Sequence, residues 1–123
     1  VFRYYGSSKN PGQVNTCMGN YACPWYWSTG STSCSENHAT YYGQVSVTNA
    51  NLVWALTRGY PAILGMQNAS GGTHWVVVNR ILGYGLADGD FFIIDPWDGT
   101  AKNLTAYTSY GYTKTCIAIY TPR

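Results

Sequence analysis

Hydrophobic residues are distributed in two different ways along the chain, and the change comes near residue 45. After that point they form short apolar runs and one helical repeat, which predict regular structure. Thr48 suits a helix N-cap, and Leu52, Val53 and Leu56 recur at helical spacing. Gly59 suits the end of this helix. We therefore predict one short helix that begins after Thr48 and ends at Gly59.

Strand-like runs follow the predicted helix. They are rich in Val, Ile and aromatic residues, and segments of hairpin length separate them. One helix followed by several such strands predicts an α+β domain with an antiparallel sheet. The predicted strands cover residues 45–47, 62–66, 75–82, 91–94, 107–112 and 116–120, with a turn at 83–90.

The segment 7–44 has a different texture. It is rich in Gly, Ser, Asn, Thr and Pro, and it carries turn signals at Asn10-Pro11-Gly12 and Ser28-Thr29-Gly30. We predict an irregular segment held by disulfides. A loop of this length is unusual inside a compact domain, which favours a functional segment or an insertion. We treat 1–123 as a single domain, in which 45–123 supplies the helix and the sheet.

Composition and charge exclude several classes of protein. The chain has 123 residues and a net charge of +2, and only 10% of its residues are charged, against about 25% in a typical globular protein. Its seven Lys and Arg residues are scattered, which argues against a nucleic-acid partner. No apolar run reaches the roughly 18 residues of a membrane-spanning helix. We expect no membrane span.

The four cysteines are Cys17, Cys23, Cys34 and Cys116. Their spacing lacks C-x-x-C pairs, and neither histidine lies at ligand spacing from them, so we expect no metal and no cofactor. An even count in a small polar chain predicts two disulfides and a secreted, extracytoplasmic protein. Of the three possible connectivities we favour Cys17–Cys23 with Cys34–Cys116. The competing interpretation is that one cysteine is a free nucleophile.

His74 and Asp95 are the candidate catalytic pair. His74 begins one predicted strand after a Gly-rich turn, and Asp95 ends the next strand. Antiparallel partners lie about 4.5–5.5 Å apart, so the carboxylate could bond one imidazole nitrogen and leave the other as a base. The alternative is that His74 is a satisfied sheet histidine and Asp95 a turn residue before Pro96.

Three ordered motifs resemble papain-like cysteine peptidases, in the branch of the bacteriocin-leader-processing peptidases and the staphopains. They are Arg58–Leu64, Gly72–Val78 and Phe92–Trp97. The resemblance implies a papain-like fold with an antiparallel sheet or half-barrel and one short helix. It also implies hydrolysis of a peptide or protein substrate, with His74 as the catalytic histidine and Asp95 as its orienting carboxylate.

The resemblance leaves the nucleophile to be placed. The family sets its cysteine at the N-terminus of a buried helix, where the dipole and the imidazolium hold a thiolate. No such helix follows Cys17, Cys23 or Cys34, although Gln13 precedes Cys17 as an oxyanion Gln would. Residues 1–6 resemble the end of that helix. We expect the helix to be missing or truncated, with the cysteine on an absent upstream segment or a second chain, and keep those three cysteines as candidates.

Three further residues are candidates for active-site support. Trp97 would pack over the pair and exclude water, and Trp75 and Gln13 are the other two. The aromatic run 25–27 is either core or a substrate platform. The alternative function is a non-catalytic module of the same fold that binds peptide or glycan through its Tyr- and Trp-rich surface.

Overall fold

The computed structural model describes residues 1–19, 27–28 and 34–123. They form two compact units, which are residues Val1–Gly43 with Tyr120–Arg123, and residues Gln44–Ile119. The single domain over 1–123 stays a prediction. The second unit begins at the point where the hydrophobic pattern changes. Cys23 and two of the aromatic residues of the run 25–27 lie outside the described residues.

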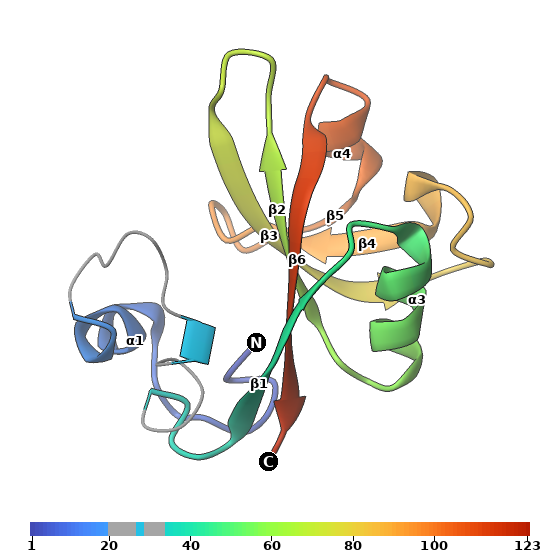
Figure 1. Cartoon of the computed structure of the whole chain (residues 1–123). Helices are drawn as coiled ribbons and strands as arrows, with labels where there is room; N and C mark the ends of the chain where they lie inside the picture. The colour runs from blue at the N-terminus through green and yellow to red at the C-terminus, as the bar shows by residue number, and fades with distance from the viewer. Residues whose placement is uncertain (20–26, 29–33) are drawn as a thin grey trace. The chain divides into compact units, whose positions relative to one another are not determined.

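The first unit contains the helix α1 (Pro11–Cys17) (Figure 1). The side chain of its N-cap, Asn10, accepts a hydrogen bond from the backbone N–H of Gln13, and the Gln13 side chain accepts one from the Asn10 N–H. This reciprocal capping box, with Pro11 in the first turn, starts a helix in a segment that we predicted to be irregular. The prediction was wrong because the turn signal at Asn10 is also a helix-start signal.

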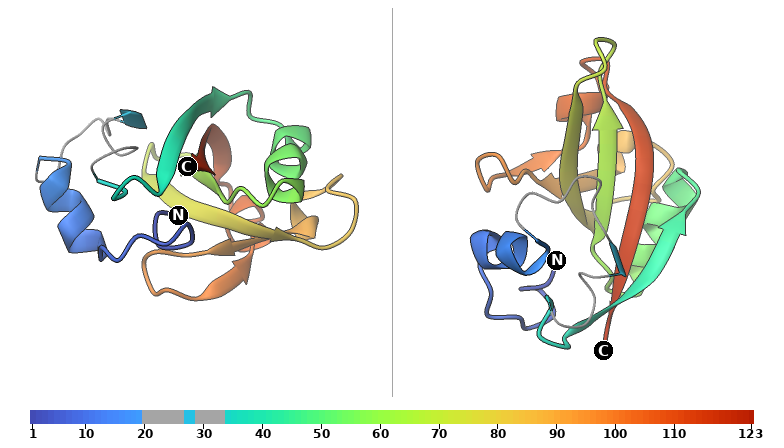
Figure 2. Two further views of the ribbon diagram at one scale, coloured as in Figure 1. Left: turned by 90° about the horizontal axis from the view of Figure 1, so that it is seen from below. Right: turned by 60° about the vertical axis from the view of Figure 1, so that its left-hand side comes forward.

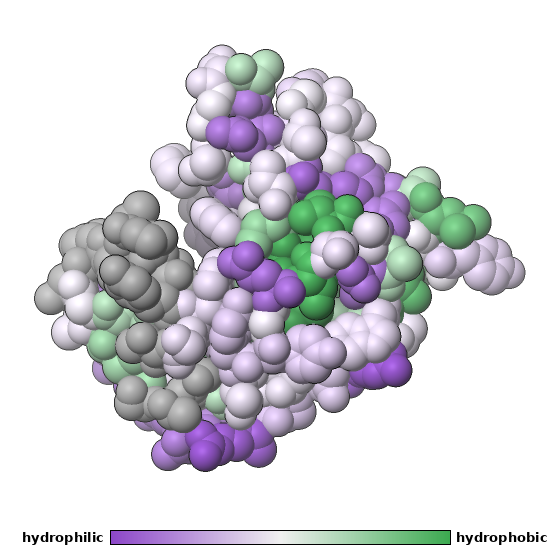
Figure 3. Space-filling model, viewed as in Figure 1, coloured by the Kyte–Doolittle hydropathy of each residue, from purple (hydrophilic) through white to green (hydrophobic). Residues whose placement is uncertain are grey.

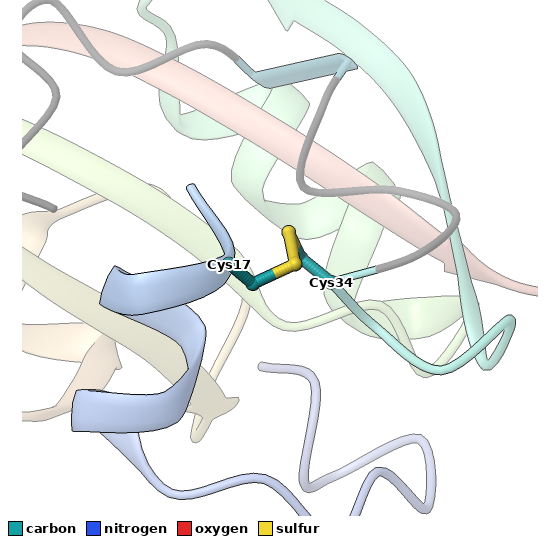
Figure 4. Close-up of a disulfide and its surroundings, with 2 residues drawn as sticks. All are labelled: Cys17 and Cys34. Atoms are coloured by element: carbon teal, nitrogen blue, oxygen red, sulfur yellow. A yellow bond between two sulfur atoms is a disulfide. The ribbon is translucent and has the colours of Figure 1, made fainter. Parts of the chain in front are cut away.

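One disulfide closes part of this unit. It joins Cys17 at the end of α1 to Cys34, with the two Cα atoms 5.6 Å apart (Figure 4). This pairing excludes both disulfides that we favoured, Cys17–Cys23 and Cys34–Cys116. Cys116 is a free cysteine. The disulfide is compatible with an extracellular protein, because such bonds persist in oxidising compartments.

Residues 1–7 have the hydrogen bonds of a helix end. The Gly6 N–H donates to the Arg3 carbonyl at 3.1 Å, and the Ser7 N–H donates to the Phe2 carbonyl at 3.0 Å. Gly6 has a φ of 108°, so these two bonds form a Schellman-type helix ending. The assignment of this turn to a catalytic helix stays a prediction.

Tyr120 is the centre of the first unit. Its ring is fully buried and meets Phe2 edge to face, with the ring centroids 5.0 Å apart. Its hydroxyl donates to the Trp27 carbonyl at 2.6 Å, and its own carbonyl accepts from the Tyr5 hydroxyl at 2.6 Å. One side chain and its backbone therefore tie together three separate segments of this unit.

The chain is an α+β protein with a six-stranded antiparallel sheet of order β1-β6-β2-β3-β4-β5. The sheet is strongly twisted, so that β4 and β5 run across the direction of β6 (Figures 1 and 2). Its elements are β1 (Ala39–Val45), α3 (Asn49–Thr57), β2 (Ala62–Gln67), β3 (Thr73–Ile81), the 3-10 turn η1 (Asp88–Asp90), β4 (Phe91–Ile94), β5 (Ala101–Asn103), α4 (Thr105–Thr108) and β6 (Thr113–Pro122).

The predicted helix is confirmed as α3. The Thr48 side chain accepts a hydrogen bond from the Asn51 N–H, as an N-cap does. Gly59 has a φ of 76°, and the Tyr60 N–H reaches back to the Ala55 carbonyl at 2.9 Å. The helix therefore stops where glycine alone adopts the left-handed conformation without strain.

The strands agree with the prediction in the middle of the sheet and differ at its edges. The strand 91–94 is confirmed with its bounds, and 62–66 corresponds to β2. Residues 107–112 were predicted as a strand, but they hold the end of α4 and a turn. The Asn103 side chain accepts from the Thr105 N–H at 2.9 Å and its hydroxyl at 2.6 Å, which starts this helix.

The hydrophobic core of the second unit follows from strand alternation. Ala62, Leu64 and Met66 on β2 share one face with Val76 and Val78 on β3. Leu52 and Ala55 of α3 and Leu104 beside α4 are buried in the same cluster. Helices thus cover one face of the sheet. A functional site can form at the end of this face, where polar side chains follow the hydrophobic ones.

A projecting segment between β3 and β4 depends on glycine. Figure 3 shows hydrophobic residues on it, where Leu82 and Leu86 are exposed. Gly85 has a φ of 72°, and a Cβ there would overlap Val53 and lie 2.9 Å from Ile81 Cδ1. Gly111 has a similar φ of 87° but nothing within 4 Å of that position.

Gly85→Ala should therefore destabilise the protein more than Gly111→Ala. Both variants place a side chain in the left-handed region, at about 1–2 kcal/mol. Only Gly85→Ala adds a core overlap, worth about 1–3 kcal/mol more. Urea denaturation at one pH measures the difference, and equal losses in the two variants would contradict the packing described for Gly85.

Candidate functional site

Four polar side chains meet at one end of the core-facing surface of the sheet. They are His74 from β3, Asp95 directly after β4, Lys102 from β5 and Tyr107 from α4. His74 shares its face with Val76 and Val78, because alternate residues of a strand point the same way. The site is therefore the polar continuation of the hydrophobic core.

His74 and Asp95 form a diagonal pair across β3 and β4. Val77 pairs with Ile94, so the same register places Val76, and not His74, directly across from Asp95. His74 Nε2 nevertheless lies 3.2 Å from Asp95 Oδ1. The structure thus brings together the two residues that we predicted as a pair, one step further along the ladder than expected.

The Asp95 carboxylate is buried and fully bonded. Its side chain is 1% exposed. Oδ1 accepts from the Trp97 backbone N–H at 2.9 Å in addition to His74, and Oδ2 accepts from Lys102 Nζ at 2.9 Å and from the Tyr107 hydroxyl. Burial works to raise the pKa of Asp95, but the hydrogen bonds from Tyr107, Lys102 and Trp97 outweigh it and hold this pKa below its ordinary value.

An ionised Asp95 determines the tautomer of His74. A carboxylate only accepts hydrogen bonds, so Nε2 of a neutral His74 must carry the proton that it donates to Oδ1. Nδ1 is then the unprotonated nitrogen and the basic atom of the ring. The His74 side chain is 20% exposed, so solvent reaches part of the ring.

Tyr107 and Lys102 complete the surroundings of the pair. The Tyr107 ring packs against the His74 ring, with centroids 4.8 Å apart. Burial and the bond to Asp95 raise the pKa of Tyr107 to about 12, so its hydroxyl stays a donor at neutral pH. Lys102 also donates to Asp98 Oδ2 at 3.0 Å. Its hydrogen bonds to the carboxylates of Asp95 and Asp98 raise the pKa of Lys102 and keep it cationic.

The two tryptophans predicted to support the site lie elsewhere. The Trp97 residue is 88% exposed, so its ring does not cover the pair, and only its backbone N–H serves Asp95. Trp75 follows His74 and points to the opposite face, where its ring packs on Gly65: a Cβ there would lie 2.8 Å from Trp75 Cζ3. Both predicted roles were wrong, and Tyr107 holds the position against His74 that we gave to Trp97.

The described cysteines do not fit the role of nucleophile beside His74. Cys17 and Cys34 form a disulfide with each other, so neither has a free thiol. Our prediction of these two residues as candidate nucleophiles was therefore wrong. Cys116 pairs with Gly65, which pairs with Trp75, and so belongs to the face opposite His74. Burial raises the pKa of Cys116, which disfavours its thiolate. The candidate Cys23 lies outside the described residues.

Gln13 has a structural part in the first unit. Its side-chain oxygen accepts from the Asn10 N–H at 2.9 Å in the capping box of α1. Its predicted support of an oxyanion stays a prediction.

Lys102 and Tyr107 were not found from the sequence. Tyr107 had been assigned to an outer strand, and the three-residue strand that carries Lys102 was not predicted. The position of Lys102 follows from the tight turn after Asp95, which returns the chain so that β5 pairs with β4. That turn is closed by the Gly99 N–H, which donates to the Asp95 carbonyl at 2.7 Å.

Comparison with known proteins adds no relative: no family model, no curated protein and no solved structure matches this chain. Within the described residues, no group of three or more His, Cys, Asp or Glu side chains is arranged to hold a metal ion. No helix in the described part of the chain is long and apolar enough to cross a membrane. The chemistry of the site is therefore argued from the oriented imidazole and its buried carboxylate.

Acid should weaken the fold through Asp95. Folding lowers the pKa of Asp95, so ionised Asp95 stabilises the protein fully above its unfolded-state pKa of about 3.9. This contribution is lost progressively as the pH falls from that value towards the lower pKa of the folded state. Asp95→Asn should cost about 3 kcal/mol at pH 7, because Lys102 loses a buried partner, and should flatten the dependence of stability on pH. Urea denaturation at pH 7 and at about pH 3 measures both effects.

Asp98→Asn is the matched control. Asp98 also bonds Lys102 but is exposed, and exposed ion pairs contribute little. A wild-type protein and an Asp95→Asn variant with the same loss of stability between the two pH values would overturn this account of the carboxylate.

Proposed function

We propose that this chain carries the histidine and the orienting carboxylate of a secreted papain-like cysteine peptidase. The observation that supports the proposal is the fixed His74: its Nε2 is bonded to a buried, ionised Asp95, which leaves Nδ1 as the base. Two of the three motifs that resemble this family, Gly72–Val78 and Phe92–Trp97, lie on β3 and β4, which carry this pair. The disulfide fits the proposed secretion.

The proposed reaction uses His74 twice. Nδ1 removes the proton of a cysteine thiol, and the resulting thiolate attacks the carbonyl carbon of a peptide bond. The C–N bond then breaks, and the protonated His74 gives its proton to the leaving amine. Water, deprotonated by His74, hydrolyses the thioester and restores the thiol. Asp95 holds the ring throughout and stabilises its protonated form.

The nucleophilic thiol is not on Cys17 or Cys34, which form a disulfide. It is not Cys116 either, which belongs to the face of the sheet opposite His74. The proposal therefore assigns it to a cysteine of an upstream segment or a second chain, or to Cys23. A peptide or protein is the proposed substrate class, since the proposed chemistry acts on an amide bond.

Replacement of His74 tests the proposal. If Cys23 is the nucleophile, we expect the purified chain to hydrolyse an unfolded protein such as casein, with inhibition by iodoacetamide. If the thiol lies on an upstream segment or a second chain, the same hydrolysis requires that segment or chain to be present. His74→Ala should lower the rate by about 10²–10⁴-fold, the usual contribution of a general base. His38→Ala is the matched control, because His38 is the second of the two histidines and is exposed; its rate should stay at the wild-type value.

Peptide mapping of the alkylated protein locates the thiol. Modification of Cys116 should be slow and the same in His74→Ala, because burial disfavours its thiolate. Hydrolysis that persists in His74→Ala would contradict the proposal for this chain. A wild-type chain without thiol-dependent hydrolysis would exclude Cys23 as the nucleophile.

One observation favours the alternative of a non-catalytic peptide- or glycan-binding module. Trp97 is 88% exposed on a turn whose backbone is bonded to Asp95, and an exposed aromatic ring offers a large contact area to a ligand. If this alternative holds, Trp97→Ala should weaken binding to a peptide or glycan array by at least about 10-fold, as a hot-spot residue does, while His74→Ala should leave it unchanged. Binding unaffected by Trp97→Ala would contradict it.

A further inference from the structure

The two oxygens of Asp95 serve different groups. Oδ1 bonds His74 and the Trp97 N–H, which belongs to the turn next to Asp95. Oδ2 bonds Lys102 and Tyr107, which come from β5 and α4. Oδ1, which faces the imidazole, is thus bonded by the turn next to Asp95, whereas Oδ2, which does not touch the imidazole, is bonded by β5 and α4.

Holding Oδ2 controls which oxygen His74 meets. The terminal torsion of an aspartate is broad and nearly two-fold, so the carboxylate has no strong orientation of its own. Two donors on Oδ2, from separate elements, oppose rotation of the group. They keep Oδ1 in the place where it accepts from Nε2.

Lys102 has a second effect, through charge. A buried carboxylate tends to take up a proton unless a cation or several donors oppose this. A protonated Asp95 can donate a hydrogen bond to Nε2, and a neutral His74 would then carry its own proton on Nδ1. The ring would lose its basic atom at Nδ1. Lys102 opposes this change because its ammonium favours the ionised carboxylate.

Tyr107 acts on both members of the pair. Its hydroxyl donates to Oδ2, and its ring lies against the imidazole, tilted by 38°. Tyr112 in turn meets Tyr107 edge to face, with centroids 5.3 Å apart. A rotation of either the carboxylate or the imidazole would break one of these contacts.

We propose that Lys102 and Tyr107 are positioning residues, which act through Asp95 to hold His74 in the tautomer with a proton on Nε2 and a free Nδ1. The inference rests on the proposed function for its value in catalysis, since a base at Nδ1 is what the peptidase reaction requires. The tautomer itself exists with or without hydrolysis, and so it can be tested separately.

Nitrogen-15 NMR of histidine-labelled protein reads the tautomer directly. At about pH 8.5, above the ordinary titration range of histidine, wild-type His74 should show an N–H signal at Nε2 and a bare-nitrogen signal at Nδ1. In Tyr107→Phe and in Lys102→Met the tautomer ratio should fall by about 5- to 30-fold, the factor that one or two kcal/mol represents. Lys102→Arg should restore the wild-type signals, because it returns the charge and the donors.

Two matched variants separate this role from a general loss of structure. Lys114→Met removes a lysine bonded to Asp88 in the same unit, and Tyr112→Phe removes the hydroxyl of the ring that supports Tyr107. Both should keep the wild-type tautomer. Signals unchanged in Tyr107→Phe and Lys102→Met, with dispersed spectra that show a folded protein, would overturn the inference. So would a wild-type His74 with mixed tautomers.

Casein hydrolysis by the same variants tells the two proposals apart. If His74→Ala hydrolyses like the wild type, the peptidase proposal fails, while the tautomer ratios still decide the positioning roles. If both proposals hold, Tyr107→Phe and Lys102→Met should lower the rate, and Lys102→Arg should recover most of it.

Discussion

The buried charge of Asp95 is the interaction on which the corner of the second unit depends. A carboxylate removed from water is costly unless its lone pairs are filled by donors. Here the donors come from β3, from the turn after β4, from β5 and from α4. These elements must therefore be in place together, because the loss of any one leaves part of a buried charge without a partner. A short strand and a one-turn helix gain a defined position in this way.

The location of the pair follows from the period of the sheet. His74 continues the row of Val76 and Val78, and Asp95 continues the row of Ile93, so both side chains emerge where the hydrophobic core ends. Hydrogen bonds are electrostatically stronger in such surroundings than in water. The same period sends Trp75 and the row of Cys116 to the other face. One alternation thus explains which residues belong to the site and which neighbours in sequence do not.

Sequence reasoning succeeded where the signals were local. Thr48 and Gly59 mark the ends of α3 by their own capping chemistry, and the apolar run of β4 needs no information from elsewhere in the chain. It failed where the outcome depends on distant partners. Tyr107 lies in a Tyr-rich run that suits a strand, but the bonds of Thr105 to the Asn103 side chain and the bond of Tyr107 to Asp95 place it on a helix. The prediction of the disulfide pairing failed for the same reason, since the sequence positions of Cys17 and Cys34 do not show that the two residues lie close together in the fold.

The cost of burying Asp95 argues for a role beyond structure. The turn after β4 is closed by backbone hydrogen bonds between Asp95, Gly99 and Thr100. Closing the turn therefore does not require the bonds of Lys102 and Tyr107 to Oδ2 of Asp95. Replacing a buried ion pair by apolar groups is often neutral or stabilising. The contacts of Oδ2 with Lys102 and Tyr107 therefore do more than close the turn: they position β5 and α4 and orient the carboxylate. An arrangement that fixes one nitrogen of His74 as donor and frees the other is what the proposed reaction requires of its base.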